Sequence, residues 1–249
     1  MLSDRELARY NRQIMISGWG NEGQERLKKA KVVVAGAGGL GSVVLIYLAA
    51  AGVGHIRVVD SDKVETTNLN RQVLYTDQDI GRRKALVAAE RLEFMNYDIR
   101  VEPIVDVIGE DNVSDLVADC PIVDAMDNLP TRFLLNRVAV RRKLPLFHGA
   151  VYAWEGRATT IIPDKTPCLQ CLYQGVIPGK PPVVGVTPAV VGCIQATEVI
   201  KYLLGMGELL TGRLLMYDGL AMTFNEMKVK KDPDCPECGT GSARGLHPV

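Results

Sequence analysis

A glycine-rich turn between a predicted strand and a predicted helix constrains the fold more than any other feature of this sequence. An apolar run at 31–35 leads into Gly36-Ala-Gly-Gly-Leu-Gly41, which opens a helical apolar pattern over 39–51. In this context glycines let backbone N–H groups and a helix N-terminus approach a phosphate. A second predicted strand, 55–60, ends at Asp60, whose carboxylate is placed to accept hydrogen bonds from a ribose. These features predict a nucleotide-binding site, but ATP and NAD fit it equally well.

Strand and helix patterns alternate along most of the chain. Such alternation predicts an α/β, Rossmann-like, mostly parallel sheet with helices on both faces. After residue 150 the pattern changes to strands that extend the sheet with antiparallel members. The expected helices are 3–14 (opened by a capping box at Ser3–Glu6), 22–30, 39–51, 81–96, 110–118, 131–142 and 189–204, and the expected strands are 31–35, 55–60, 99–105, 121–125, 145–149, 156–162, 213–218 and 221–230.

The chain has 249 residues and a formal net charge of zero, with acidic and basic residues interspersed. We expect one domain over 1–239, made of N-terminal helices (3–30), a nucleotide-binding core (31–150) and a mixed-sheet region with a crossover loop (151–239), followed by a flexible tail (240–249). No basic stretch indicates nucleic acid, and no apolar run reaches the roughly 20 residues of a membrane span. The polar first residues are unlike a signal peptide, so a cytoplasmic protein is expected.

Polar residues after the second strand favour ATP over NAD. Asn68, Arg71 and Gln72 follow Asp60 closely, and Lys84 adds a second cation. A dinucleotide's pyrophosphate is usually satisfied by the helix end, whereas a triphosphate with a departing pyrophosphate needs cations around it. The arginine and the lysine therefore predict a triphosphate site.

Four of the six cysteines form two Cys-x-x-Cys pairs, Cys168–Cys171 and Cys235–Cys238. Four thiolates are the number that a tetrahedral structural zinc requires, and no position remains open for catalysis. A disulfide framework is improbable in a cytosolic chain; two unrelated redox motifs or free thiols remain the alternative. Cys120 and Cys193 lie in apolar surroundings and are interpreted as core residues.

Several motifs occur in one order and together resemble the MoeB/ThiF/HesA adenylyltransferases, relatives of the ubiquitin-activating enzymes. The resemblance covers about residues 3–239. It rests on Arg9-Tyr-Asn-Arg-Gln13, the turn at 36–41, Asp60-Ser-Asp-x-Val-Glu-x-x-Asn-Leu-x-Arg-Gln72, Gly81-x-x-Lys84, Asp124-Ala-Met-Asp-Asn128, the two cysteine pairs and Met216-Tyr-Asp218. The resemblance implies ATP-dependent adenylation of the C-terminal Gly-Gly carboxylate of a ubiquitin-like sulfur-carrier protein, with release of pyrophosphate. Molybdopterin synthesis, thiamine synthesis and tRNA thiolation are the pathways it implies.

The resemblance also implies roles for single residues. Arg12, Arg71, Lys84 and Asp127 are the expected catalytic residues, with Arg12 acting on the partner's nucleotide in a homodimer and Asp127 holding Mg²⁺. The implied ATP-binding residues are Gly36, Gly38, Gly39, Gly41, Asp60, Asp62, Asn68, Arg71, Gln72, Lys84, Asp127 and Asn128. Asp124 is left out of the site as structural, and nothing in the sequence marks His55 or His148 as catalytic.

One departure from the family pattern concerns a covalent step. Many relatives carry a cysteine in the crossover loop, and here Pro181 stands near that position, with no cysteine between Cys171 and Cys193. A thioester with the carrier requires such a thiol. We therefore expect the reaction to stop at the acyl-adenylate, which a separate sulfur donor then attacks.

Three other functions compete with this interpretation. The same ATP site serves an enzyme that adenylates a different carboxylate or a peptide acceptor. An NAD-dependent oxidoreductase has no need of Arg71, Lys84 and Asp127, and a non-catalytic zinc scaffold does not explain a complete ATP motif set. The sequence identifies neither the carrier nor the sulfur donor.

Overall fold

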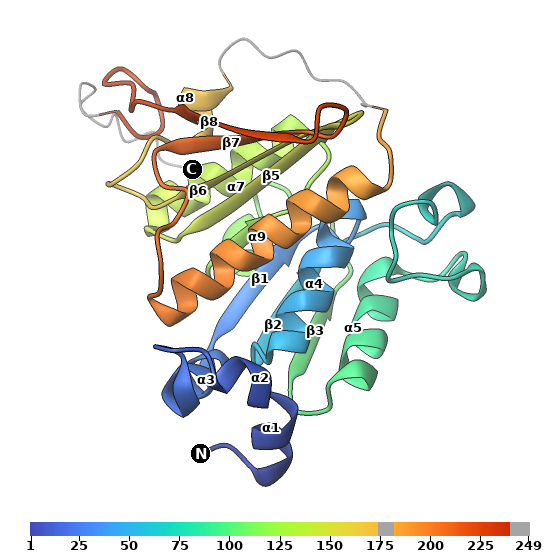
Figure 1. Ribbon diagram of the computed structural model, residues 1–249. Coiled ribbons are helices and arrows are strands. Elements are labelled where there is room, and N and C mark those ends of the chain that lie inside the picture. Colours follow the sequence, from blue (N-terminus) through green and yellow to red (C-terminus); the bar gives the residue numbers. More distant parts are fainter. Residues whose placement is uncertain (174–181, 240–249) are drawn as a thin grey trace.

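A single mixed sheet runs through the computed structural model, which describes residues 1–173 and 182–239 (Figure 1). Its strand order is β3-β2-β1-β4-β5-β6-β7-β8. The strands are β1 Lys31–Ala35, β2 His55–Val59, β3 Arg100–Ile104, β4 Ile122–Asp124, β5 Leu146–Tyr152, β6 Glu155–Ile161, β7 Arg213–Asp218 and β8 Thr223–Lys228. The helices are α1 Asp4–Arg9, α2 Asn11–Ile14, α3 Gly20–Lys29, α4 Gly39–Ala51, α5 Lys84–Met95, α6 Val113–Val117, α7 Leu129–Arg142, α8 Leu169–Leu172 and α9 Val186–Leu204.

The first five strands are parallel to their neighbours, and β6, β7 and β8 continue the sheet in antiparallel pairing. The predicted fold class is confirmed, both for the parallel part of the sheet and for its antiparallel extension. The chain builds outward from β1 through β2 to β3 and then returns to place β4 on the other side of β1. This reversal makes the carboxyl ends of β1 and β4 a topological switch point, where open α/β sheets bind ligands.

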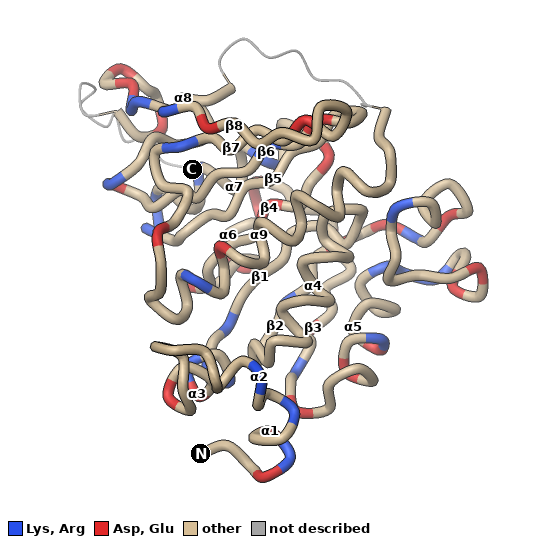
Figure 2. The backbone as a smooth tube through the Cα atoms, in the orientation of Figure 1, with Lys and Arg blue, Asp and Glu red and all other residues tan. Residues whose placement is uncertain are grey.

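Helices cover both faces of the sheet, as predicted. Alternate residues of β1 pack into the hydrophobic clusters on the two faces of the sheet, because successive side chains of a strand point to opposite faces. Val32 and Val34 belong to the core cluster under α4, α5 and α9, whereas Val33 and Ala35 pack with α6 and α7. Acidic and basic side chains are interspersed over the described chain (Figure 2), and none of its helices has the length and apolarity needed to cross a membrane.

The glycine-rich turn joins β1 to α4 by a close backbone contact. Gly36 has φ +96°, a left-handed conformation that favours glycine. A Cβ added to Gly41 would lie only 1.9 Å from the carbonyl oxygen of Gly36. Glycine at position 41 therefore allows the first turn of α4 to rest directly on the loop that ends β1.

Several predicted boundaries were wrong for identifiable reasons. The first helix is broken at Tyr10, whose buried hydroxyl accepts a hydrogen bond of 2.8 Å from Asn96 Nδ2. Helix α5 begins at Lys84 rather than 81, because Gly81 has φ +86°. Helix α9 begins at Val186, three residues before the expected start, and accommodates Pro188 in its first turn, where a proline is tolerated. The predicted tail 240–249 and residues 174–181 of the predicted loop lie outside the described residues.

We expect Gly41→Ala to lower the free energy of unfolding by about 2 kcal/mol, because the added methyl group must displace backbone. In a chain of this length the melting temperature should fall by about 4–8 °C. Gly109→Ala is the matched control, since its added Cβ would meet only Asn112 Oδ1, at 3.9 Å. Thermal unfolding followed by circular dichroism measures both variants. Equal melting temperatures for the two would contradict the close-contact interpretation.

Candidate functional site

A cavity of about 300 Å³ lies at the carboxyl ends of β1, β2 and β4. Most of the residues predicted to bind a nucleotide line it, although they come from five separate segments. The predicted residues that line the cavity are Gly36, Gly38, Gly39, Asp60, Asp62, Arg71, Gln72, Lys84, Asp127 and Asn128. The cavity therefore lies at the topological switch point of the sheet.

Asp60 holds the glycine-rich turn from the end of β2. Its Oδ2 accepts a hydrogen bond of 2.8 Å from the Ala37 N–H, and its Oδ1 accepts one of 2.8 Å from the Asp62 N–H. Burial raises the pKa of this carboxyl group, and the backbone hydrogen bond from Ala37 opposes that effect. Carboxylate oxygens have further lone pairs, so Asp60 can still accept hydrogen bonds from a ligand hydroxyl.

The two predicted cations that line the cavity, Lys84 and Arg71, are in different electrostatic states. Lys84 is buried at the start of α5, and its Nζ donates to Asp62 Oδ2 at 3.0 Å. Arg71 donates to the Thr67 carbonyl and to Asn70 Oδ1, both at 2.9 Å. These acceptors are neutral, and within the described residues Arg71 forms no ion pair. Its charge is therefore available to an anionic ligand.

The remaining wall combines a buried acceptor with two exposed polar groups. Gln72 is buried, and its Oε1 lacks a hydrogen-bond partner among the described residues. Asn128 caps α7 by accepting a hydrogen bond of 3.0 Å from the Thr131 N–H. Asp127, one residue earlier, is exposed and lines the cavity. Buried polar groups are nearly always satisfied, so the Gln72 oxygen is expected to meet a ligand or ordered water.

Three predicted site residues do not line the cavity. Gly41 lies behind the turn, and Asn68 is buried with its Oδ1 accepting from the Glu65 N–H at 3.1 Å, which stabilises the 3₁₀ turn before Arg71. Arg12 is exposed on α2, at the end of the sheet opposite the cavity (Figure 1). Gly41 and Asn68 therefore act on the cavity through backbone position, and Arg12 cannot reach the cavity of its own chain.

Sequence reasoning missed other lining residues. Asp106, Val107 and Ile108 follow β3, and Thr131 and Arg132 lie in the first turn of α7. The sequence could have indicated Asp106, Val107 and Ile108, because β3 ends at the same edge of the sheet as β1 and β2. Arg132 follows the Asp127-Asn128 motif at helical spacing, which places it one turn below Asn128 on the same face.

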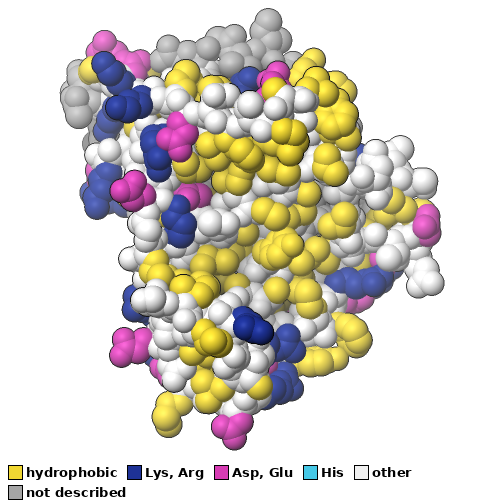
Figure 3. All heavy atoms as spheres, viewed as in Figure 1, with side chains coloured by type: hydrophobic (Ala, Val, Ile, Leu, Met, Phe, Trp, Pro, Cys, Tyr) yellow, Lys and Arg dark blue, Asp and Glu magenta, His cyan; other side chains and the backbone are white. Residues whose placement is uncertain are grey.

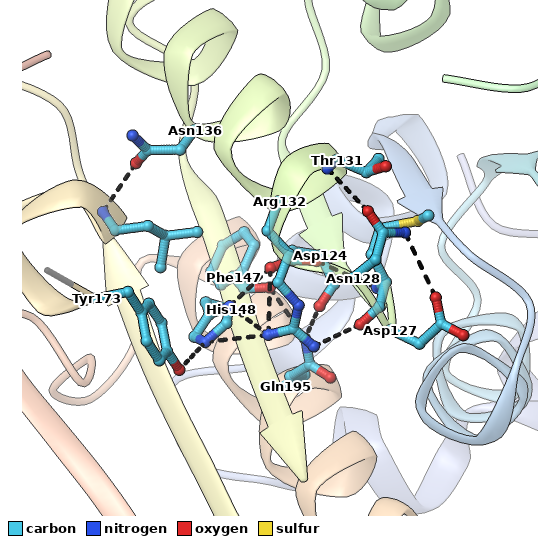
Figure 4. Close-up of polar contacts among 12 residues, drawn as sticks. Asp124, Asp127, Asn128, Thr131, Arg132, Asn136, Phe147, His148, Tyr173 and Gln195 are labelled. Carbon is cyan, nitrogen blue, oxygen red and sulfur yellow. Dashed lines mark hydrogen bonds and ion pairs between the residues drawn. The ribbon is translucent and has the colours of Figure 1, made fainter. Parts of the chain in front are cut away.

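Beneath the cavity lies a buried polar network that the sequence did not reveal (Figure 4). Asp124 and His148 are register partners on the parallel strands β4 and β5 and are both fully buried. His148 Nδ1 lies 2.6 Å from Asp124 Oδ2, and His148 Nε2 lies 2.7 Å from the Tyr173 hydroxyl. Arg132 Nη1 lies 3.9 Å from Asp124 Oδ2 and contacts the imidazole ring, while its Nη2 donates to the Met126 carbonyl.

The charges in this network follow from burial and pairing. Burial lowers the pKa of His148, whereas Arg132 and His148 hold the pKa of Asp124 below its usual value despite burial. A neutral imidazole that donates from Nδ1 to Asp124 and accepts at Nε2 from Tyr173 satisfies every partner. Asp124 then remains the anion that balances Arg132, so the prediction that Asp124 is structural agrees with its position outside the cavity lining.

The four cysteines of the two Cys-x-x-Cys pairs come together beside the middle of α7, where Asn136 and Arg137 contact their segments. Their sulfur atoms all lie within 4.8 Å of one another, with 3.7 Å between Cys168 and Cys235 and 3.5 Å between Cys171 and Cys238. A tetrahedral ion with Zn–S bonds of ~2.3 Å places sulfurs ~3.8 Å apart. The donor set therefore fits a Cys₄ zinc, and the metal would join segments more than 60 residues apart in sequence.

The fold and the site together define a class of protein. It is an α/β nucleotide-binding protein with a glycine-rich turn suited to phosphate, an acid suited to ribose and a separate Cys₄ cluster. The model of the ThiF family matches residues 10–237, and the chain belongs to this family, as the sequence motifs predicted.

Two relatives match this chain over nearly their whole length. It is 47% identical to the SAMP-activating enzyme E1 of Haloferax volcanii, covering 100% of this chain and 94% of the relative. It is 46% identical to the sulfur carrier protein adenylyltransferase of Thermus thermophilus, covering 94% and 91%. Among solved structures it is similar to E. coli MccB with ATP, with 27% identity, a TM-score of 0.84 and coverage of 93% and 73%.

We expect Cys235→Ser to reduce the zinc content from one ion per chain and to lower the melting temperature by roughly 10 °C, since each kcal/mol shifts it by about 2–4 °C in chains of this length. Cys193→Ser is the control, because Cys193 lies on α9 and outside the cluster. Metal analysis and thermal unfolding of the purified variants measure both effects. Full zinc content in Cys235→Ser would exclude the Cys₄ site.

Proposed function

We propose that this protein uses ATP to adenylate the C-terminal Gly-Gly carboxylate of a ubiquitin-like sulfur-carrier protein, with release of pyrophosphate. The observation that carries the proposal is the cavity itself, in which a glycine-rich turn, the acid Asp60 and Arg71, a cation with no ion pair among the described residues, meet. The relatives named above support the sulfur carrier as acceptor. We assign this activity to residues 1–239 as one adenylation domain, and to the cytoplasm, which supplies ATP and keeps cysteine thiols reduced.

The proposed chemistry needs no general base, because the attacking carboxylate is already anionic. One of its oxygens attacks the α-phosphorus, and the bond from that phosphorus to the bridging oxygen breaks. Pyrophosphate leaves with the bonding electron pair, so positioning and charge neutralisation must supply the catalysis. Asp60 and the turn at 36–41 would hold the ribose and phosphates, while Arg71 and Lys84 would neutralise the departing pyrophosphate.

A magnesium ion and a second copy of the protein would complete the site. Asp127 is an exposed carboxylate in the cavity wall, and Mg²⁺ is usually bound by one or two carboxylates together with substrate phosphates. Asp127 would hold that ion, which neutralises phosphate charge. Arg12 lies too far from its own cavity, so we propose that it completes the cavity of a second copy in a homodimer.

We further propose that the enzyme forms no thioester with the carrier. Cys193 is half-buried on α9, and burial raises the pKa of its thiol, which disfavours the nucleophilic thiolate. The acyl-adenylate would then be the product that a separate sulfur donor attacks. A reducible carrier adduct that disappears in Cys193→Ser would overturn this part of the proposal.

The β7–β8 hairpin offers the surface for a protein acceptor. Every residue of the edge strand β8 is exposed, and Leu220, Met222 and Phe224 are 75%, 72% and 54% exposed. Trp154 lies beside them, since its carbonyl accepts from the Gly219 N–H at 2.9 Å. We call these four residues the hairpin patch; hydrophobic side chains also gather over this region in Figure 3. Exposed apolar patches and unpaired sheet edges are typical of protein-binding surfaces.

Carrier-dependent ATP–pyrophosphate exchange is the assay that tests the proposed function. We expect exchange with a ubiquitin-fold protein that ends in Gly-Gly, and a loss of at least about 100-fold in Arg71→Ala, as for other charge-stabilising groups. Arg100→Ala, exposed at the amino end of β3, is the matched control. ATP binding without exchange for any such carrier would favour the second candidate, adenylation of a different carboxylate or a peptide acceptor; the chain is also similar to the Microcin C7 biosynthetic enzyme MccB in complex with N-formylated MccA. NAD binding without ATP binding would overturn both.

The hairpin patch makes a separate prediction. Phe224→Glu should raise the carrier concentration for half-maximal exchange at least about 10-fold, because burying a charge removes more than 1.4 kcal/mol of binding. ATP affinity should be unchanged. Phe94→Glu, an equally conspicuous apolar side chain on α5 at 75% exposure, is the control and should leave the carrier dependence unaffected. Equal effects of the two variants would exclude the patch as the carrier surface.

A further inference from the structure

The segment that carries the first cysteine pair ends in direct contact with the network beneath the cavity. Cys168 is the N-cap of α8, Cys171 lies within α8, and Tyr173 follows as its C-cap. The Tyr173 hydroxyl lies 2.7 Å from His148 Nε2, and the two rings meet edge to face at a centroid distance of 5.4 Å. Two residues after a cysteine of the Cys₄ cluster, the chain is therefore anchored to the floor of the nucleotide site.

From His148 the contacts continue to the loop that carries Asp127. His148 and Asp124 hold the guanidinium of Arg132, which donates to the Met126 carbonyl immediately before Asp127. Figure 4 shows Tyr173, His148 and Arg132 in one line, with Asp127 and Asn128 at its far end. A displacement of Tyr173 would therefore be transmitted to the cavity wall, because His148, Asp124 and Arg132, which lie between Tyr173 and that wall, are buried and closely packed.

Helix α7 provides a second connection between the same two places. Its N-cap, Asn128, lines the cavity, and two turns later Asn136 Oδ1 accepts from the Leu169 N–H at 2.9 Å, next to Cys168. Arg137 donates to Glu237 Oε1 at 3.1 Å, inside the second cysteine pair. Both cysteine pairs are thus hydrogen-bonded to the helix whose first turn forms part of the cavity.

We propose that Tyr173 is a positioning residue that couples the Cys₄ metal site to the nucleotide cavity, so that metal and nucleotide stabilise each other's binding. The coupling acts through His148 and Arg132 on the loop 125–128. It goes beyond the proposed adenylation, since it concerns nucleotide binding alone and requires no acceptor protein. The Cys₄ cluster is then part of the apparatus that shapes the active site as well as a staple of the fold.

Thermodynamic linkage makes the coupling measurable from either end. If the metal increases nucleotide affinity by some factor, the nucleotide must increase metal affinity by the same factor, and typical factors are about 5- to 150-fold. A purely structural zinc, independent of the cavity, would bind equally tightly with and without nucleotide. The affinity for zinc therefore reports the coupling without any assay of catalysis.

The test is the share of zinc that the protein retains at equilibrium in competition with a chromogenic chelator, which gives the affinity for zinc. We expect a non-hydrolysable ATP analogue at saturation to raise this affinity at least about 5-fold in the wild type and so to protect the bound zinc from the chelator. Tyr173→Phe removes only the hydroxyl that contacts His148, so it should still bind one zinc but lose most of the protection. Tyr217→Phe is the control, because its hydroxyl contacts Met222 Sδ in the hairpin at 3.6 Å, and it should keep full protection.

His148→Gln interrupts the same contacts one residue nearer the cavity and should also lose the protection, which provides a second variant if Tyr173→Phe does not fold. Unchanged protection in both variants, or an analogue that binds the wild type by calorimetry without raising the affinity for zinc, would overturn the coupling and leave the proposed adenylation intact. An analogue that does not bind at all would overturn the proposed function together with the coupling.

Discussion

The reversal of strand order between β1 and β4 determines where this molecule can hold a ligand. Two parallel strands that lie side by side but lead their chains to opposite sides leave a crevice between their carboxyl ends. Here the crevice receives the turn after β1 and the loop after β4, while β2 adds Asp60 from the adjoining position. The close contact between Gly41 and the Gly36 carbonyl then brings the N-terminus of α4 to the crevice. Residues 36–41, 60–72 and 125–132 become one site only through this arrangement.

Among the cations that line the cavity, Arg71 has no carboxylate partner in the described residues, so it is the group best placed to meet an anionic ligand. Lys84 is paired with Asp62, and Arg132 is balanced by Asp124 below the floor, so each carries its own counterion. Arg71 contacts only neutral oxygens among the described residues and keeps its charge for the ligand. The His148 imidazole, kept neutral by burial, adds no charge while it holds Asp124 and Tyr173 in place. The buried network therefore sets the shape of the cavity without competing for its ligand.

The predictions from sequence succeeded where one local pattern was enough and failed where distant segments meet. The β1 and α4 boundaries were correct because apolar periodicity and glycines determine them locally. The start of α1 was correct for the same reason, since Ser3 and Glu6 form the predicted capping box, but its break at Tyr10 depends on Asn96, 86 residues away. Arg132, His148 and Tyr173 escaped notice likewise, because their relation appears only when α7, β5 and the end of α8 converge.

The sequence by itself determined the fold class, the family, the identity of the four cysteines as a set and ten of the residues that line the cavity, since glycine turns, strand-end acids and paired cysteines are read over short spans. The tertiary structure alone decided that Asn68 supports the cavity from behind, that Arg12 lies at the far end of the sheet, and that Tyr173, next to the first cysteine pair, contacts the cavity floor. Those facts depend on which strands are neighbours and how helices cross them. Such long-range geometry arises from packing the whole core, and no local pattern encodes it.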